Sequence, residues 1–141
     1  MDREHNLPGS RLIEPDENRA LKEKNLKGQS SYVMDRVRRE AVLAALLKRC
    51  SDNHWSLLAA HVRTNHVHIV VDAEVQPERI MNDLKSYASR CLNRLGLDDP
   101  ARKRWARHGS TRWLWKRNSV SAAIRYVVDQ QDEPMAVFEA P

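Results

Sequence analysis

The fold prediction depends on residues 61–71, which read His61-Val-Arg-Thr-Asn-His-Val-His-Ile-Val-Val71. Because side chains alternate across a β-strand, His66 and His68 share one face with Val70, and the other face carries the apolar row Val67, Ile69 and Val71. Neutral imidazole is a good ligand for a divalent metal, and a strand directs both rings toward one point. Two imidazoles do not complete a metal site, so a third ligand has to come from elsewhere.

The alternative interpretation is a half-buried strand whose polar face happens to carry histidine. For a His-x-His pair in general this is the more frequent case, since short motifs give many false positives. The flanking residues favour a site here. Residues 55–62 also read as a strand, and the polar triplet Arg63-Thr64-Asn65 reads as a hairpin turn. The two histidines are therefore expected near the turn of a hairpin.

Composition limits the class of protein. A chain of 141 residues suits one compact domain, and the formal net charge of +5 favours a polyanionic partner, nucleic acid first. Cys50 and Cys91 are too few and too far apart for a disulfide framework, which indicates a reducing compartment. No apolar run approaches the roughly 18 residues of a membrane span, and the N-terminus lacks a signal-peptide core. These features predict a cytoplasmic, nucleoid-associated protein with no membrane partner.

The pattern along the chain predicts a short helix at about Asn18 to Leu26 and three longer helices after residue 31. The first of the longer helices is capped by Asp35 and runs to about Lys48, and the second begins at Pro77 and ends at Gly96. The third follows Ser119 or Ser121 and contains residues 122–131. Residues 1–31 are polar and charged and are predicted to form an arm, which leaves residues 32–141 as the domain.

The segment 101–128 contains no acidic residue, and three tryptophans are interleaved with its basic residues. A charge run is usually a solvated face, and at least one tryptophan is expected in the core. A run of one sign with interspersed tryptophans is better explained by phosphate contacts and base stacking. With two basic residues of the middle helix, the predicted DNA-binding set is Lys85, Arg90, Arg104, Arg107, Arg112, Lys116 and Arg117.

The last predicted helix carries a phenol and an amide on one stripe, because Ala122, Tyr126 and Gln130 are each four residues apart. If this helix packs near the start of the histidine strand, two imidazoles and an amide oxygen can hold Mg²⁺ or Mn²⁺. The phenol of Tyr126 would then be the nucleophile that attacks a phosphodiester.

Several segments resemble the single-tyrosine HUH transposases, whose name denotes a histidine–hydrophobic–histidine signature. Thr64-Asn-His-Val-His-Ile-Val-Val71 resembles this signature, and Tyr126-Val-Val-Asp-Gln130 resembles the nucleophile motif. Lys85-Ser-Tyr-Ala-Ser-Arg90 is similar to the segment between them. Trp105-Ala-Arg-His-Gly-Ser-Thr-Arg-Trp-Leu-Trp115 is similar to stretches in insertion-sequence and repeat-associated members. The resemblance runs from about Tyr32 to Gln131, with the motifs in the family's order.

The resemblance implies a ferredoxin-like α+β fold, an antiparallel sheet with helices packed on one face. It implies cleavage and rejoining of single-stranded DNA, with hairpin ends, through a 5′-phosphotyrosine and a free 3′-hydroxyl. His66 and His68 become metal ligands, Gln130 the third ligand and Tyr126 the nucleophile. Tyr87 is the other candidate nucleophile and ranks lower, because its position does not match the tyrosine motif. Some relatives exchange the tyrosine helix between the subunits of a homodimer, and others act as monomers.

One departure from the family concerns its first strand, which precedes the first long helix and lies inside the sheet. No such strand is visible between Met1 and Ser31. This absence supports an alternative function, a truncated or catalytically inactive remnant that binds single-stranded or hairpin DNA. A His-x-His metallohydrolase is a third hypothesis, but it needs further His or Asp ligands, and the remaining histidines have no familiar hydrolase spacing.

Overall fold

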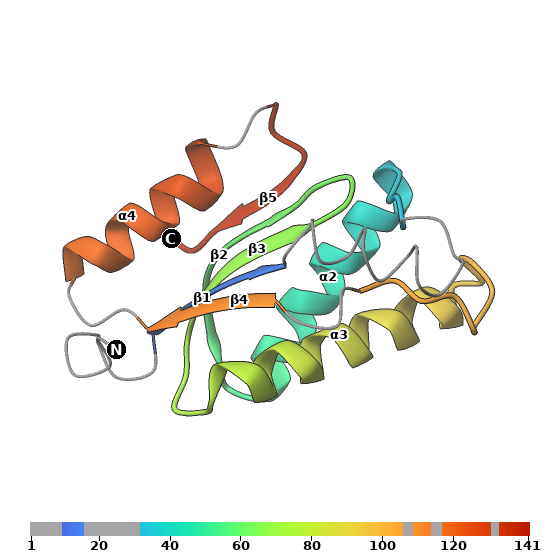
Figure 1. The fold of residues 1–141 in the computed structure, drawn as a ribbon, viewed down its shortest axis with the longest axis horizontal. Coiled ribbons are helices and arrows are strands. Elements are labelled where there is room, and N and C mark those ends of the chain that lie inside the picture. Colours follow the sequence, from blue (N-terminus) through green and yellow to red (C-terminus); the bar gives the residue numbers. More distant parts are fainter. Residues whose placement is uncertain (1–9, 16–31, 106–108, 114–116, 131–132) are drawn as a thin grey trace.

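Five antiparallel strands and three helices form the fold in Figure 1, a computed structural model that describes residues 10–15, 32–105, 109–113, 117–130 and 133–141. The elements in chain order are β1 (Ser10–Pro15), α2 (Arg36–Asp52), β2 (Ser56–Val62), β3 (Val67–Asp72), α3 (Pro77–Arg94), β4 (Gly109–Trp113), α4 (Arg117–Asp129) and β5 (Ala136–Glu139). The strand order in the sheet is β4-β1-β3-β2-β5. The α+β class and the antiparallel sheet are as predicted.

The central hairpin forms where the sequence predicted it. β2 and β3 pair antiparallel, and the Arg63 N–H donates to the His66 carbonyl at 2.9 Å across the turn. The apolar row of β3 faces the larger hydrophobic core, while Val70 packs in a second, smaller cluster. The alternation in the sequence therefore gave the correct faces, with His66 and His68 on the side opposite the larger core.

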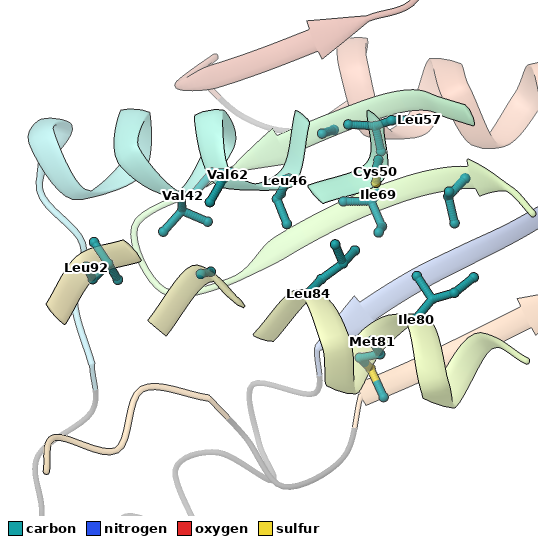
Figure 2. Close-up of a cluster of buried hydrophobic side chains, with 14 of the residues drawn as sticks. Val42, Leu46, Cys50, Leu57, Val62, Ile69, Ile80, Met81, Leu84 and Leu92 are labelled. Atoms are coloured by element: carbon teal, nitrogen blue, oxygen red, sulfur yellow. The ribbon is translucent and has the colours of Figure 1, made fainter. Parts of the chain in front are cut away.

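The larger core lies between the sheet and helices α2 and α3. Figure 2 shows the side chains of both helices meeting those of β2 and β3, with Val42, Leu46, Leu84 and Ile80 turned inward. Asp35 caps α2 as predicted, since its carboxylate accepts from the Arg38 N–H at 3.0 Å. No helix in the described part of the chain has both the length and the apolar character to cross a membrane.

The first strand is a correction to the sequence prediction. Residues 10–15 form β1, which lies inside the sheet and pairs with both β3 and β4. The segment reads Ser10-Arg-Leu-Ile-Glu-Pro15, with two adjacent apolar residues in place of an alternation and a terminal proline that has no N–H. It is a strand because two neighbours supply backbone partners, and that is not visible in the local sequence. The division at residues 31 and 32 stays a prediction, and the short helix predicted at about Asn18 to Leu26 lies outside the described residues.

The position of the last helix also differs from the prediction that all helices share one face. α2 and α3 cover one side of the sheet, and α4 lies on the other side (Figure 1). The contact between α4 and the sheet has a buried centre of small apolar side chains: Ala59 and Val70 from the sheet, and Val120, Ala123 and Val127 from the helix. Leu58, Ile124 and Val128 pack against this centre while partly exposed. This arrangement places α4 on the face that carries the two histidines. The helix begins at Arg117, two residues before the earlier of the two predicted caps.

Candidate active site

The two histidines lie together at the hairpin end of β3. His66 immediately precedes the strand and His68 is its second residue, and their ring centroids are 4.6 Å apart with the ring planes at 86°. The Nδ1 atom of His66 is 2.8 Å from Oδ1 of Asn65. In the tautomer in which Nδ1–H donates to this oxygen, the lone pair of His66 is on Nε2. An imidazole held in this way is suited to bind a metal ion through Nε2.

The protonation state of His68 follows from its burial. The side chain is 5% exposed, and both ring nitrogens are buried. Burial, followed by the charges of His66, His61 and Arg63, lowers the pKa of His68 to about 4. The ring is therefore neutral at pH 7, the state in which an imidazole can be a metal ligand.

Helix α4 brings Tyr126 to this pair of histidines. The rings of Tyr126 and His68 meet edge to face, with centroids 5.9 Å apart and planes at 87°. The side chain of Tyr126 is 38% exposed, so a substrate can reach the phenol. The predicted juxtaposition of the phenol and the imidazoles is present within one chain.

Gln130 follows the last residue of α4 and is exposed, one helical turn after Tyr126. Within the described residues, no group of three or more His, Cys, Asp or Glu side chains could hold a metal ion. An amide oxygen is a ligand type that Mg²⁺ and Mn²⁺ accept, so Gln130 remains a candidate for the third ligand. Neutral imidazoles and an amide oxygen are ligand types that suit such an ion, and His66, His68 and Gln130 are the candidates.

A third histidine, His61, lies beside the pair and was not predicted to have a specific function. It is fully buried and stands opposite His68 across the two central strands. Its Nε2 accepts the Met135 N–H at 2.9 Å, so its proton is on Nδ1, which donates to the Val127 carbonyl at 3.0 Å. Burial lowers the pKa of His61 and favours this neutral form. The sequence feature that could have identified His61 was its place on the strand that pairs with the strand of the histidine motif.

Arg104 is buried inside the protein, so the prediction that it contacts DNA is wrong. Its side chain is 1% exposed, and its guanidinium donates to Oδ1 of Asn93 at 2.8 Å and to the Leu97 carbonyl at 3.0 Å. It also lies 3.4 Å from a carboxylate oxygen of Asp98. A guanidinium enclosed by these partners cannot reach a phosphate, and the sequence gave no sign of this because the neighbouring arginines look alike.

The other predicted DNA contacts fall on different faces of the molecule. Arg117 is exposed at the start of α4, which lies on the same side of the sheet as the two histidines. Lys85 and Arg90 belong to α3, across the sheet from α4. Arg107 and Lys116 lie outside the described residues, as does the side chain of Arg112. Of the described candidates, Arg117 is therefore the one on the same helix as the phenol.

Trp105 and Tyr87 belong to the side of the sheet away from the histidines. The Trp105 indole packs on the larger core and donates to Oγ of Ser89 at 2.7 Å. The prediction that at least one tryptophan is a core residue is confirmed. Tyr87 packs on the same core, with the guanidinium carbon of Arg49 5.2 Å from its ring centroid. Tyr87 therefore lies across the sheet from the paired imidazoles.

The comparison with protein families adds independent evidence. The model of the family described as "Transposase IS200 like" matches residues 24–128, which include the histidine pair and Tyr126. No curated protein matches the chain. The fold and the grouping of imidazoles with a phenol define an α+β domain with the residues for nucleophilic chemistry. The chain belongs to the IS200-like transposase family. Family membership makes it a DNA-processing enzyme with DNA as its partner, in a family that generally depends on divalent metal.

Proposed function

We propose that this chain cleaves and rejoins single-stranded DNA through a covalent phosphotyrosine at Tyr126. The observation that carries the proposal is the edge-to-face contact of Tyr126 with His68, 5.9 Å between centroids, beside the second imidazole of the pair. Metal coordination is one way to activate a weak nucleophile such as a phenol, and two imidazoles beside Tyr126 supply ligands of the right type. The match to the IS200-like family supports the same chemistry.

The reaction exchanges one phosphodiester for another. The Tyr126 oxygen attacks the phosphorus, the bond from phosphorus to the 3′ oxygen breaks, and the 5′ phosphate remains on the tyrosine. The phenol gives up its proton to solvent, and the departing 3′ oxygen takes one up as a hydroxyl. Attack by a 3′-hydroxyl on the phosphotyrosine reverses these changes, so a strand can be rejoined without ATP.

A divalent ion, Mg²⁺ or Mn²⁺, supplies Lewis-acid stabilisation of the charge that develops on the phosphate oxygens. His66 and His68 are the proposed imidazole ligands, and Gln130 the proposed oxygen ligand. The neutral state of His68, whose pKa burial lowers to about 4, suits this role. The hydrogen bond at Nδ1 of His66 helps to fix the orientation of that ring and leaves its Nε2 for the ion.

The DNA strand is proposed to cross the face of α4. Arg117, in the first turn of that helix, lies nine residues before Tyr126, which is about 14 Å along the helix axis and about half a turn around it. The strand would therefore pass around the N-terminal end of α4 to reach the phenol. Two features favour a phosphate at this end of the helix: the positive charge of the exposed guanidinium and the positive end of the helix dipole. Lys85 and Arg90 lie across the sheet and would contact a different part of the substrate, such as a hairpin end. A DNA substrate also implies action in the cytoplasm, in association with the nucleoid.

The alternative function, a DNA-binding remnant that does not cleave, rested on the missing first strand. β1 occupies that position in the sheet, so the observation that favoured this alternative no longer stands.

The test is formation of a covalent adduct with a labelled single-stranded DNA in the presence of Mg²⁺ or Mn²⁺. Tyr126→Phe is expected to abolish the adduct without loss of the fold, because a half-exposed phenol loses only its hydroxyl. Tyr87→Phe is the matched control and is expected to leave the adduct intact. A folded Tyr126→Phe protein that still becomes covalently attached to DNA would refute the proposal.

A further inference from the structure

His61 reaches the active-site face because of an irregularity in β2. The register of β2 against β3 shifts between Leu57 and Ala59, so Leu58 is an extra residue on one strand. Leu57 therefore faces the larger core, while both Leu58 and Ala59 face α4. From Ala60 onward the alternation is inverted relative to a regular strand, and this inversion directs His61 toward α4.

On that face, His61 joins three segments through its two ring nitrogens. Nδ1–H donates to the carbonyl of Val127, the residue after Tyr126, at 3.0 Å. Nε2 accepts the N–H of Met135, in the segment between α4 and β5, at 2.9 Å. A single imidazole on β2 therefore fixes both the last turn of the tyrosine helix and the chain that follows it.

Neighbouring residues of the hairpin reinforce the same connection. Arg63 donates through Nη1 to the carbonyl of Glu133 at 2.9 Å, and the hydroxyl of Thr64 lies 3.5 Å from Sδ of Met135. The β2–β3 hairpin therefore contacts the segment after α4 at Glu133 and at Met135.

The apolar contact between α4 and the sheet restrains the rotation and the axial position of the helix only weakly. Its fully buried members are alanines and valines, and the larger Leu58 and Ile124 are only partly buried against them. Small side chains allow a helix to rotate or slide more readily than interlocking large ones. A directional hydrogen bond at the last turn restricts both motions. Because the hydrogen bond is made at Val127, next to Tyr126, it limits the displacement of the phenol more directly than that of the rest of the helix.

We propose that His61 is a positioning residue, which orients the end of α4 so that Tyr126 faces His66 and His68 of its own chain. The inference rests on the proposed function, because it assigns His61 a part in the same strand cleavage. His61 does not touch the DNA or the reacting atoms. Small displacements of a nucleophile can cost about 100-fold in rate, so loss of this residue is expected to slow cleavage well below the wild-type rate.

The experiment compares His61→Phe with Val62→Ala in the full-length chain. Phenylalanine fills the space of the imidazole but can neither donate nor accept. Val62 is fully buried and belongs to the larger core, on the other side of the sheet from the α4 cluster, so its truncation is the matched control for general destabilisation. Each variant is assayed for the rate of adduct formation and for DNA affinity, at a temperature below both unfolding transitions.

We expect His61→Phe to lower the rate of adduct formation by at least about tenfold while DNA affinity stays within about twofold. Hydrogen exchange at the Met135 amide should accelerate in His61→Phe and remain slow in Val62→Ala, because only the first loses the acceptor. Equal slowing in both variants, or a wild-type rate in His61→Phe, would overturn the proposal.

A second variant, His61→Gln, keeps the test decisive if His61→Phe does not fold. Its amide can replace one of the two hydrogen bonds, so its rate should lie between those of wild type and of a variant that makes neither; a wild-type rate would count against a positioning role. The outcome is separable from that of the proposed function. A His61 variant with wild-type rate beside an inactive Tyr126→Phe refutes only the inference about His61, whereas an active Tyr126→Phe refutes the strand-cleavage mechanism itself.

Discussion

The phenol ring of Tyr126 stands at 87° to the imidazole of His68, and the two centroids are 5.9 Å apart within a single chain. One residue comes from a helix near the C-terminus and the other from a central strand, with 57 positions between them in the sequence. The helix reaches this place because it lies on the sheet face opposite α2 and α3. Because the contact lies within one chain, each chain is expected to supply its own nucleophile to its own pair of imidazoles.

The proposed metal ligands should differ in how much each contributes. His68→Ala is expected to abolish adduct formation, because it removes a neutral ligand that burial already holds in place. Gln130→Ala should leave activity but raise the concentration of Mn²⁺ for half-maximal rate by about tenfold, equivalent to about 1.4 kcal/mol of binding. Metal titrations of the adduct rate, after treatment with a chelator, measure both effects. An unchanged titration curve for Gln130→Ala would remove this residue from the ligand set.

The intrachain contact predicts that mixing two inactive variants will not restore activity. One variant is Tyr126→Phe, and the other carries His66→Ala and His68→Ala. If each chain builds its own site, a mixture contains no complete site and forms no adduct. The measurement is the adduct yield of the mixture against each variant alone and against wild type diluted with Tyr126→Phe. Restored adduct in the mixture would mean that the tyrosine helix serves a partner chain.

A cluster around Asp98 predicts a dependence of stability on pH. Its carboxylate accepts from the Tyr32 hydroxyl at 2.6 Å and pairs with Arg38 at 3.0 Å, beside the buried Arg104. Burial raises the pKa of Asp98, but the hydrogen bonds from Tyr32 and Arg38 outweigh it and the pKa is lowered. The stabilisation is therefore full above the unfolded pKa of about 4 and is lost as the pH falls through the lower folded pKa.

Asp98→Asn tests this expectation. Asparagine tolerates the backbone φ of 74° at this position but cannot carry the charge. We expect a loss of about 1–3 kcal/mol at pH 7 that shrinks toward pH 2, measured by urea unfolding at several pH values. Glu40→Gln breaks the exposed pair with Arg36 and should cost at most about 0.5 kcal/mol. A constant difference between Asp98→Asn and wild type across this pH range would contradict the assignment.

The internal position of β1 predicts the effect of an N-terminal truncation. Removal of residues 1–15 would leave the facing edges of β3 and β4 without a backbone partner, and unpaired strand edges associate with other chains. We expect a fall in Tm of about 10 °C or more, together with aggregation in size-exclusion chromatography. A truncation of residues 1–9 keeps the strand and is the control. Equal Tm values for the two truncated chains would argue against the pairing of β1 in the sheet.

The sequence by itself determined the hairpin, the faces of β3, the cap of α2 and the extent of α3. These features depend on local rules: alternation along a strand, a carboxylate before a helix, and a proline and a glycine at the helix ends. The sequence also pointed to the family, because the segments that contain His66, His68 and Tyr126 resemble its motifs and occur in the same order. No tertiary information was needed for any of these.

Only the tertiary structure decided the place of β1, the side of the sheet that α4 covers, and the roles of Arg104 and His61. β1 has little strand character of its own and exists through its pairing with β3 and β4. Arg104 resembles its basic neighbours until burial separates it from them. His61 faces α4 because one extra residue in β2 inverts the alternation, and its hydrogen-bond partners lie 66 and 74 residues away. Contacts over such distances depend on the packing of the whole chain, and local sequence patterns do not encode them.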